Sequence, residues 1–126
     1  MKTIYLVRHG DYLGEELIFW GLVQMQRAAS EIKDDIGDLE NVVIYTSRLG
    51  IAQHSAQILS RVMEGVPVEE CFQLDSYRRE IHKLVNEING TAIIVSHKPD
   101  IWSYLERVTG MGSDLKYGQV RKVEVE

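Results

Sequence analysis

Three polar clusters in this chain combine residue types that can do chemistry, and each directly follows a short apolar run. They are Arg8-His9-Gly10, Ser47-Arg48 and His97-Lys98. An imidazole can act as nucleophile, acid or base, and a guanidinium offers a planar fork of donors that suits phosphate. Two imidazoles with one or two guanidiniums describe a site for a compact dianion. A phosphoryl group is the natural occupant, because its oxygens need several fixed donors.

The apolar runs before these clusters are rich in β-branched and aromatic residues, which predicts buried strands. They cover residues 4–7, 42–45 and 91–95. In an open α/β sheet the carboxyl ends of neighbouring parallel strands lie at one edge, where ligands bind. We therefore expect the three clusters to converge there.

Strand and helix patterns alternate along the rest of the chain. Apolar residues at helical spacing predict helices over residues 21–36, 51–62, 77–88 and 100–108, with Pro99 before the last. Further strands are expected over residues 68–74 and, at an edge, 117–125, and residues 11–19 predict a loop or a short helical turn. This alternation predicts an α/β three-layer sandwich, with a mostly parallel sheet and helices on both faces.

Length and composition indicate one globular domain spanning residues 1–126. The chain is 44% hydrophobic and 26% charged, and its formal net charge is -5. This acidic balance argues against a general nucleic-acid binder, which needs clustered Lys and Arg. No apolar run reaches transmembrane length and no secretion signal is evident, so we expect a cytoplasmic protein without a membrane partner.

The sequence contains no pattern that indicates a metal or an organic cofactor. Cys71 is the only cysteine, and the four histidines are scattered without carboxylates at ligand spacing. Neither a Walker loop nor a dinucleotide fingerprint occurs, so we expect the site to act without a cofactor. His54 and His82 fall in predicted helices and are expected to be structural or solvated. Trp20 and Trp102 are expected in the core or in a pocket wall.

The motifs resemble those of the histidine phosphatase superfamily, which has a phosphoglycerate mutase-like fold. Leu6-Val7-Arg8-His9-Gly10 is similar to its signature, and Val95-Ser96-His97 followed by Pro99 is similar to its second histidine motif. The helix patterns between them are also similar, at Gly21 with Gln24 and at Tyr45-Thr46-Ser47 through Ala52, Ser55-Ala56 and Leu59. The resemblance covers nearly the whole chain. The small size of the chain and the Asp that follows Arg-His-Gly are most similar to the phosphohistidine phosphatase branch of this superfamily.

The resemblance implies a role for each matching residue. His9 would attack phosphorus and carry the phosphoryl group until water removes it. Arg8 would bind the equatorial oxygens, and a protonated His97 would stabilise charge on the same group. Gly10 would leave room for the nucleophile and supply backbone contacts to the substrate.

One position departs from the family pattern. The family has an arginine at the start of the second long helix, where this chain has Ile51. Loss of one such donor typically lowers a rate on the order of 10²–10³-fold. Arg48 precedes Ile51 by one helical turn, and the sequence leaves open whether its long side chain reaches the same pocket.

The general acid also stays open at this point. Larger relatives carry a glutamate after the third strand, and the nearest carboxylates here are Asp75 and Glu80, while Asp11 lies directly beside the nucleophile. A leaving imidazole, with a pKa near ~6.5, needs less help from an acid than an alcohol does. A missing acid would therefore favour phosphoramidates or activated esters over sugar phosphates.

Two hypotheses follow from these residues. The first is a metal-independent phosphatase that uses His9 covalently on phosphohistidine in a protein or on a small phosphoester. The alternative is a phosphatase-fold module that binds a phosphorylated partner, a small molecule or a protein, without turnover. The intact Arg8-His9-Gly10 and His97 favour the enzyme, and Ile51 favours the binding module.

Overall fold

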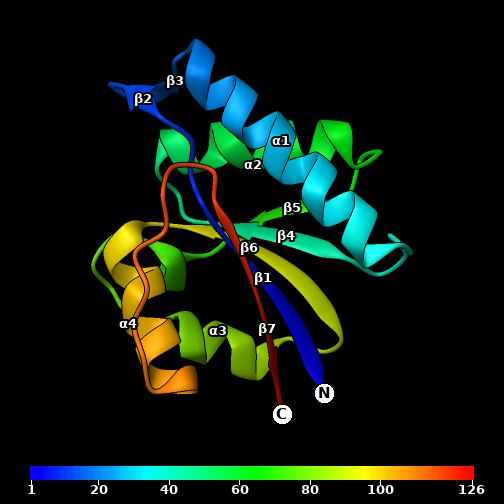
Figure 1. Ribbon diagram of the computed structural model, residues 1–126, viewed down its shortest axis with the longest axis vertical. Helices are drawn as coiled ribbons and strands as arrows, with labels where there is room; N and C mark the ends of the chain where they lie inside the picture. Colours follow the sequence, from blue (N-terminus) through cyan, green and yellow to red (C-terminus); the bar gives the residue numbers. More distant parts are fainter.

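The computed structural model describes residues 1–126 and is built on a five-stranded sheet in the order β5-β4-β6-β1-β7 (Figure 1). Its strands are β1 (Lys2–Arg8), β4 (Val43–Thr46), β5 (Val68–Glu70), β6 (Thr91–Ser96) and β7 (Val120–Val125). Neighbouring strands run parallel except at β7, which pairs antiparallel with β1 at the edge. The predicted mostly parallel sheet with an edge strand at the carboxyl end is confirmed.

Helices cover both faces of this sheet (Figure 1). On one face lie α1 (Phe19–Ile36) and α2 (Gly50–Val62), and on the other lie α3 (Ile81–Glu87) and α4 (Lys98–Thr109). Pro99 stands in the first turn of α4, where its missing N–H does no harm. The predicted three-layer α/β sandwich is therefore confirmed. None of these helices is long and apolar enough to span a lipid bilayer.

The two hydrophobic cores are separated by the sheet, and β1 contributes to both. Ile4 and Leu6 pack toward α3 and α4, whereas Tyr5 and Val7 pack toward α1 and α2. All four side chains are almost completely buried. This explains why the strand is a continuous apolar run rather than an alternating one: each face of a central parallel strand is covered.

The parallel register aligns the ends of the three central strands. Arg8 of β1 pairs with Ser96 of β6, and Thr46 of β4 pairs with Val95. The ladder continues one step further, because the His9 amide donates to the Ser96 carbonyl at 3.3 Å. The residues that follow each strand are therefore held at one edge of the sheet.

Residues 11–19 differ from the predicted loop or helical turn. They contain a small hairpin made of β2 (Tyr12–Leu13) and β3 (Glu16–Leu17), with Gly14 at a positive φ of 67° in its turn. Strands of two residues are too short to show a period in the sequence. The helix α1 begins at Phe19, and Trp20 in its first turn is 62% exposed, so the prediction of Trp20 in the core is wrong.

The predicted helix over residues 77–88 begins four residues late, at Ile81. Tyr77 and Arg79 adopt positive φ angles, which no helix allows. The buried Asp100 carboxylate holds this conformation by accepting hydrogen bonds from the Tyr77 amide at 3.0 Å and the Arg79 amide at 2.7 Å. Asp100 lies on α4, so the sequence near residue 77 carries no sign of this contact.

Two other predicted strands are shorter than expected. The strand predicted over residues 68–74 ends at Glu70 and is followed by a 3₁₀ turn, Phe72–Leu74. The edge strand predicted from residue 117 begins at Val120. The residues before it form a turn that packs against the end of β1.

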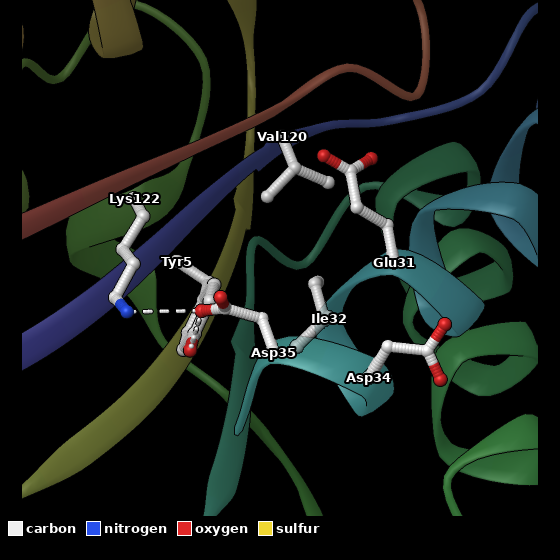
Figure 2. Close-up of a pocket in the computed structure, with 7 residues that line it drawn as sticks. All are labelled: Tyr5, Glu31, Ile32, Asp34, Asp35, Val120 and Lys122. Atoms are coloured by element: carbon white, nitrogen blue, oxygen red, sulfur yellow. Dashed lines mark hydrogen bonds and ion pairs between the residues drawn. The ribbon is translucent and has the colours of Figure 1, made fainter. Parts of the chain in front are cut away.

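A polar network near the middle of β1 attaches α1 to the edge strand (Figure 2). The Tyr5 hydroxyl donates to Asp35 Oδ2 at 2.6 Å, and Lys122 Nζ lies 2.9 Å from the same oxygen. Burial, together with this hydrogen bond, raises the pKa of Tyr5. A cavity of about 440 Å³ opens beside the network, four residues before His9 or roughly 13 Å along the strand. The network has a structural role that is separate from the polar clusters.

We predict that Asp100→Ala lowers the free energy of unfolding by about 3 kcal/mol, because two amides of a positive-φ loop lose a charged acceptor. Urea unfolding at neutral pH measures the change. The matched control is Asp114→Ala, since Asp114 is 61% exposed and only meets Lys98 at 3.7 Å. It should change stability by less than about 0.5 kcal/mol. Equal effects of the two variants would contradict the structural role of Asp100.

Candidate active site

The carboxyl edge of the sheet brings together residues from all three polar clusters. The ring centroids of His9 and His97 lie 5.2 Å apart, and Ser47 Oγ lies 2.9 Å from His97 Nε2. His9 and His97 are only 5% and 4% exposed. Both histidines and Ser47 thus lie together, buried, at this edge of the sheet, and Arg8 precedes His9 on the same strand end.

The tautomer of His9 follows from its hydrogen bond. His9 Nδ1 lies 3.0 Å from the Gly10 carbonyl oxygen, which can only accept, so Nδ1 carries the proton. In the neutral ring the lone pair is then on Nε2, and no protein group bonds to it. A neutral imidazole with a free Nε2 is a nucleophile.

The pKa of His9 supports the neutral form. The pKa of His9 is lowered from 6.5 to about 4. Burial is the largest cause and the nearby His97 and Arg8 act in the same direction, while the Gly10 carbonyl and Asp11 oppose the shift. His9 is therefore uncharged near pH 7. Its nitrogen is available for attack without prior loss of a proton.

Close packing against α1 and α2 fixes the backbone around His9. A Cβ on Gly10 would lie 2.8 Å from the Gly21 carbonyl oxygen, and one on Gly21 would lie 2.1 Å from the Asp11 carbonyl oxygen. Two glycines are thus needed where the strand end crosses α1. The Gly10 amide donates to Ser55 Oγ at 3.1 Å. Both polar backbone groups of Gly10 are used inside the protein, and they orient His9.

His97 is neutral in the unliganded site as well. Burial lowers its pKa, with a further contribution from Arg8, although Asp100 and Asp75 oppose the shift. The protonated His97 that the family resemblance implies would therefore need a bound anion to raise this pKa. The hydrogen bond between His97 Nε2 and Ser47 Oγ fixes the orientation of the ring.

Most of the guanidinium donors of Arg8 have no acceptor in the protein. Nη1 donates to the Leu115 carbonyl at 3.0 Å, and this is the only hydrogen bond of the side chain to the protein. Nε is buried without a partner. A buried donor left unpaired is unfavourable unless a ligand satisfies it. The Nε–Nη2 edge can bind two oxygens of one phosphoryl group.

Arg48, the predicted second phosphate ligand, is engaged elsewhere. Its guanidinium forms an ion pair with Asp75, in which Nε at 2.9 Å and Nη2 both donate to Oδ2, and its side chain is 61% exposed. No hydrogen bond joins it to His9, Arg8 or His97. Ile51 is buried at the start of α2. The site in this structure therefore contains one arginine, Arg8.

The three candidate general acids have different surroundings. Asp75 is held by Arg48, whose hydrogen bond lowers the pKa of this carboxyl, so it is ionised at neutral pH and has no proton to donate. Glu80 pairs with Arg78 and Lys83, away from the histidines. Asp11 lies next to Gly10 and accepts from the Tyr12 amide at 2.8 Å. The structure brings none of the three into hydrogen bonding with His9 or His97.

Two tyrosines line the site although the sequence analysis did not single them out. The Tyr12 ring lies 5.4 Å and the Tyr117 ring 5.8 Å from the His9 ring, and Tyr117 also stacks on Arg8. Tyr117 is 108 positions from His9 in the chain, so no local spacing could place it there. His54 accepts from the Leu17 amide at 3.3 Å, which is a structural contact. No group of three His, Cys, Asp or Glu side chains is arranged to hold a metal ion.

Solved structures provide an independent comparison for this arrangement. A mycobacterial glucosyl-3-phosphoglycerate phosphatase matches with a TM-score of 0.76 at 15% identity, over 98% of this chain and 90% of its own. Phosphoglycerate mutase from Plasmodium falciparum matches at 0.67 and 23% identity, over 84% and 67% of the two chains. SixA from Agrobacterium tumefaciens, which carries a provisional assignment as a phosphohistidine phosphatase, matches at 0.69 and 16% identity, over 86% and 77% of the two chains. The fold is phosphoglycerate mutase-like.

The expected fold is thus confirmed by structure rather than by sequence similarity. No family model and no curated protein sequence matches the chain. Within this phosphoglycerate mutase-like fold, the site lies where ligands of open α/β sheets bind, outside the carboxyl ends of the strands.

We predict that the free energy of unfolding falls as the pH is lowered from about 6.5 to about 4. In this window the unfolded chain takes up a proton on His9 while the folded protein does not, so the unfolded state gains stability. The shift corresponds to about 3 kcal/mol. Denaturant unfolding at a series of pH values measures the slope. His9→Gln should reduce this slope, and the part that remains should come from His97. Equal slopes for the wild type and His9→Gln would contradict the assignment of the pH dependence to His9.

Proposed function

We propose that this protein is a phosphatase that forms a phosphohistidine intermediate on His9. The observation that carries the proposal is the state of His9: a buried, neutral ring whose Nδ1 is bonded to Gly10 and whose Nε2 is free. The unpaired edge of Arg8, on the same strand end, supports a phosphoryl group as the occupant. The similarity in fold to phosphatases and a mutase is consistent with this chemistry.

In the first step His9 Nε2 attacks phosphorus and a nitrogen–phosphorus bond forms. The bond from phosphorus to the leaving atom breaks, and its electron pair stays on that atom, which solvent then protonates. Arg8 binds the phosphoryl oxygens, and the approaching dianion raises the pKa of His97 so that it can donate to the same group. The Gly10 carbonyl stabilises the positive ring of the intermediate through Nδ1–H.

In the second step water attacks phosphorus from the side that the leaving group has vacated. The nitrogen–phosphorus bond breaks and its electron pair returns to Nε2, releasing phosphate and a proton. The low pKa of His9 helps here, because a weakly basic imidazole is a good leaving group. The ring returns to its neutral starting state.

The surroundings of the carboxylates point to the substrate class. Asp75 is ionised and paired, and Asp11 and Glu80 form no hydrogen bond with the histidines. A site without a poised acid favours leaving groups that need little protonation, such as imidazole or an activated phenolate. We therefore propose phosphohistidine in a protein, or a small activated phosphoester, as substrate.

A second candidate function is binding of a phosphorylated partner without turnover. One observation favours it: Ile51 and the Arg48–Asp75 pair leave a single guanidinium in the site. Ground-state binding of a phosphate needs fewer fixed donors than stabilisation of a transition state. Turnover separates the two functions.

We predict metal-independent phosphate release from a phosphohistidine peptide and from p-nitrophenyl phosphate. His9→Ala should abolish both activities, because it removes the nucleophile. His82→Ala is the matched control, since His82 lies on α3 and contacts no residue of the site, and it should leave both rates unchanged. Turnover of a sugar phosphate should be at least about 10²-fold slower than that of the activated substrates. Phosphate release is measured colorimetrically and the intermediate by acid-quenched labelling.

The outcomes distinguish the two functions. Turnover that depends on His9 supports the covalent mechanism. Saturable phosphate binding without turnover of any substrate would contradict the enzyme hypothesis and support the binding module.

We also predict that Arg48→Ala lowers kcat/KM less than about threefold, because Arg48 meets only Asp75 and solvent. Arg8→Ala should lower it by about 10²-fold or more, because it removes the donor edge in the site. Steady-state kinetics with p-nitrophenyl phosphate compare the two variants. Losses of similar size would show that Arg48 moves into the site when substrate binds.

A further inference from the structure

We infer that Tyr117 is a positioning residue for Arg8, holding the guanidinium so that its Nε–Nη2 edge faces the phosphoryl group. This inference rests on the proposed function, because it concerns the same anion site. Tyr117 belongs to the segment 115–119, which follows α4. This segment would align Arg8, the single arginine of the anion site.

The ring of Tyr117 contacts both chemical groups of the strand end. Arg8 Cζ lies 3.9 Å from the ring centroid, which is the separation of a stacked guanidinium and an aromatic ring. The same ring lies 5.8 Å from the His9 ring. Because Tyr117 is half-buried, the contact with Arg8 is partly shielded from water.

The backbone of the segment 115–119 is bonded to the same strand end. The Leu115 carbonyl accepts from Arg8 Nη1, and the Gln119 carbonyl accepts from the Arg8 amide at 3.2 Å. The Gly118 amide lies 3.0 Å from the Arg8 carbonyl oxygen and 3.2 Å from that of His9. One short segment thus forms hydrogen bonds with both the main chain and the side chain of Arg8.

Two features keep this segment in place. Leu115 is buried in the core on the side of α3 and α4, which fixes its carbonyl. Gly118 adopts a positive φ of 70°, and a Cβ there would lie 2.7 Å from Gln24 Cβ on α1. The turn therefore packs between β1 and α1, and this packing determines the position of the Tyr117 ring.

The consequence concerns the donors that remain for a ligand. One N–H of Nη1 is bonded to Leu115 and Tyr117 lies over one face of the guanidinium, while the Nε–Nη2 edge has no hydrogen-bond partner in the protein. A planar fork held in this way binds two phosphoryl oxygens without first losing rotational freedom. With Ile51 in place of a second arginine, anion binding depends on this alignment.

The test measures binding of inorganic phosphate by isothermal titration calorimetry, which is independent of turnover. Tyr117→Leu should weaken phosphate binding about tenfold, because the stacked ring is lost. Tyr117→Phe keeps the ring and should bind within about twofold of the wild type. If Tyr117→Leu does not fold by circular dichroism, Tyr117→Met replaces it, since Met keeps the apolar volume without the ring.

A double-mutant cycle tests whether Tyr117 acts through Arg8. In an Arg8→Lys background, Tyr117→Leu should change phosphate affinity by less than about twofold, because the flat guanidinium is already absent. An undiminished loss in that background would overturn the inference. So would equal weakening by Tyr117→Phe and Tyr117→Leu, which would assign the effect to the hydroxyl.

The failures of the two proposals are distinguishable. Phosphate binding that follows this cycle, without turnover of any substrate, leaves the role of Tyr117 intact and refutes the phosphatase. Turnover that depends on His9 but does not distinguish the Tyr117 variants leaves the phosphatase intact and refutes the role of Tyr117. A wild-type protein that binds no phosphate refutes the role of Tyr117, and turnover that depends on His9 then still decides the phosphatase.

Discussion

The parallel ladder between β1 and β6 is the constraint on which the rest of this structure depends. Its register pairs Arg8 with Ser96 and extends to the His9 amide, so the two residues that follow the strands, His9 and His97, must lie side by side. The ladder is in turn fixed by apolar side chains on both faces of β1, because a shift by one residue would exchange the two cores. Backbone hydrogen bonding and core packing thus determine the distance between the histidines.

Burial at this strand end sets the chemistry of the site. It keeps His9 and His97 neutral, with the charge of Arg8 acting in the same direction, and it leaves Arg8 Nε without a hydrogen-bond partner in the protein. Buried groups of this kind interact more strongly with an anion than exposed groups would, because the effective dielectric around them is low. The same burial destabilises the protonated protein in acid. Reactivity and acid sensitivity therefore have one physical origin.

Short-range patterns predicted much of the fold. The apolar run before Arg8-His9-Gly10 and the run over residues 91–95 identified the central strands, because strands covered on both faces must be apolar throughout. The predicted start of α3 was wrong, because Asp100 on α4 stabilises positive φ angles at Tyr77 and Arg79. The hairpin at residues 12–17 was missed, because two-residue strands carry no period. Errors occurred where a contact from a distant element decides the local conformation.

For the site, the sequence by itself determined which chemical groups are available and at which strand ends they stand. Only the tertiary structure decided how they are used: Arg48 pairs with Asp75 rather than with the site, and Tyr117 and Leu115 hold Arg8 from the far end of the chain. The tautomer of His9 also became known only from its contact with the Gly10 carbonyl. The physical reason is that hydrogen bonding and stacking depend on separation in space, whereas a sequence records separation along the chain.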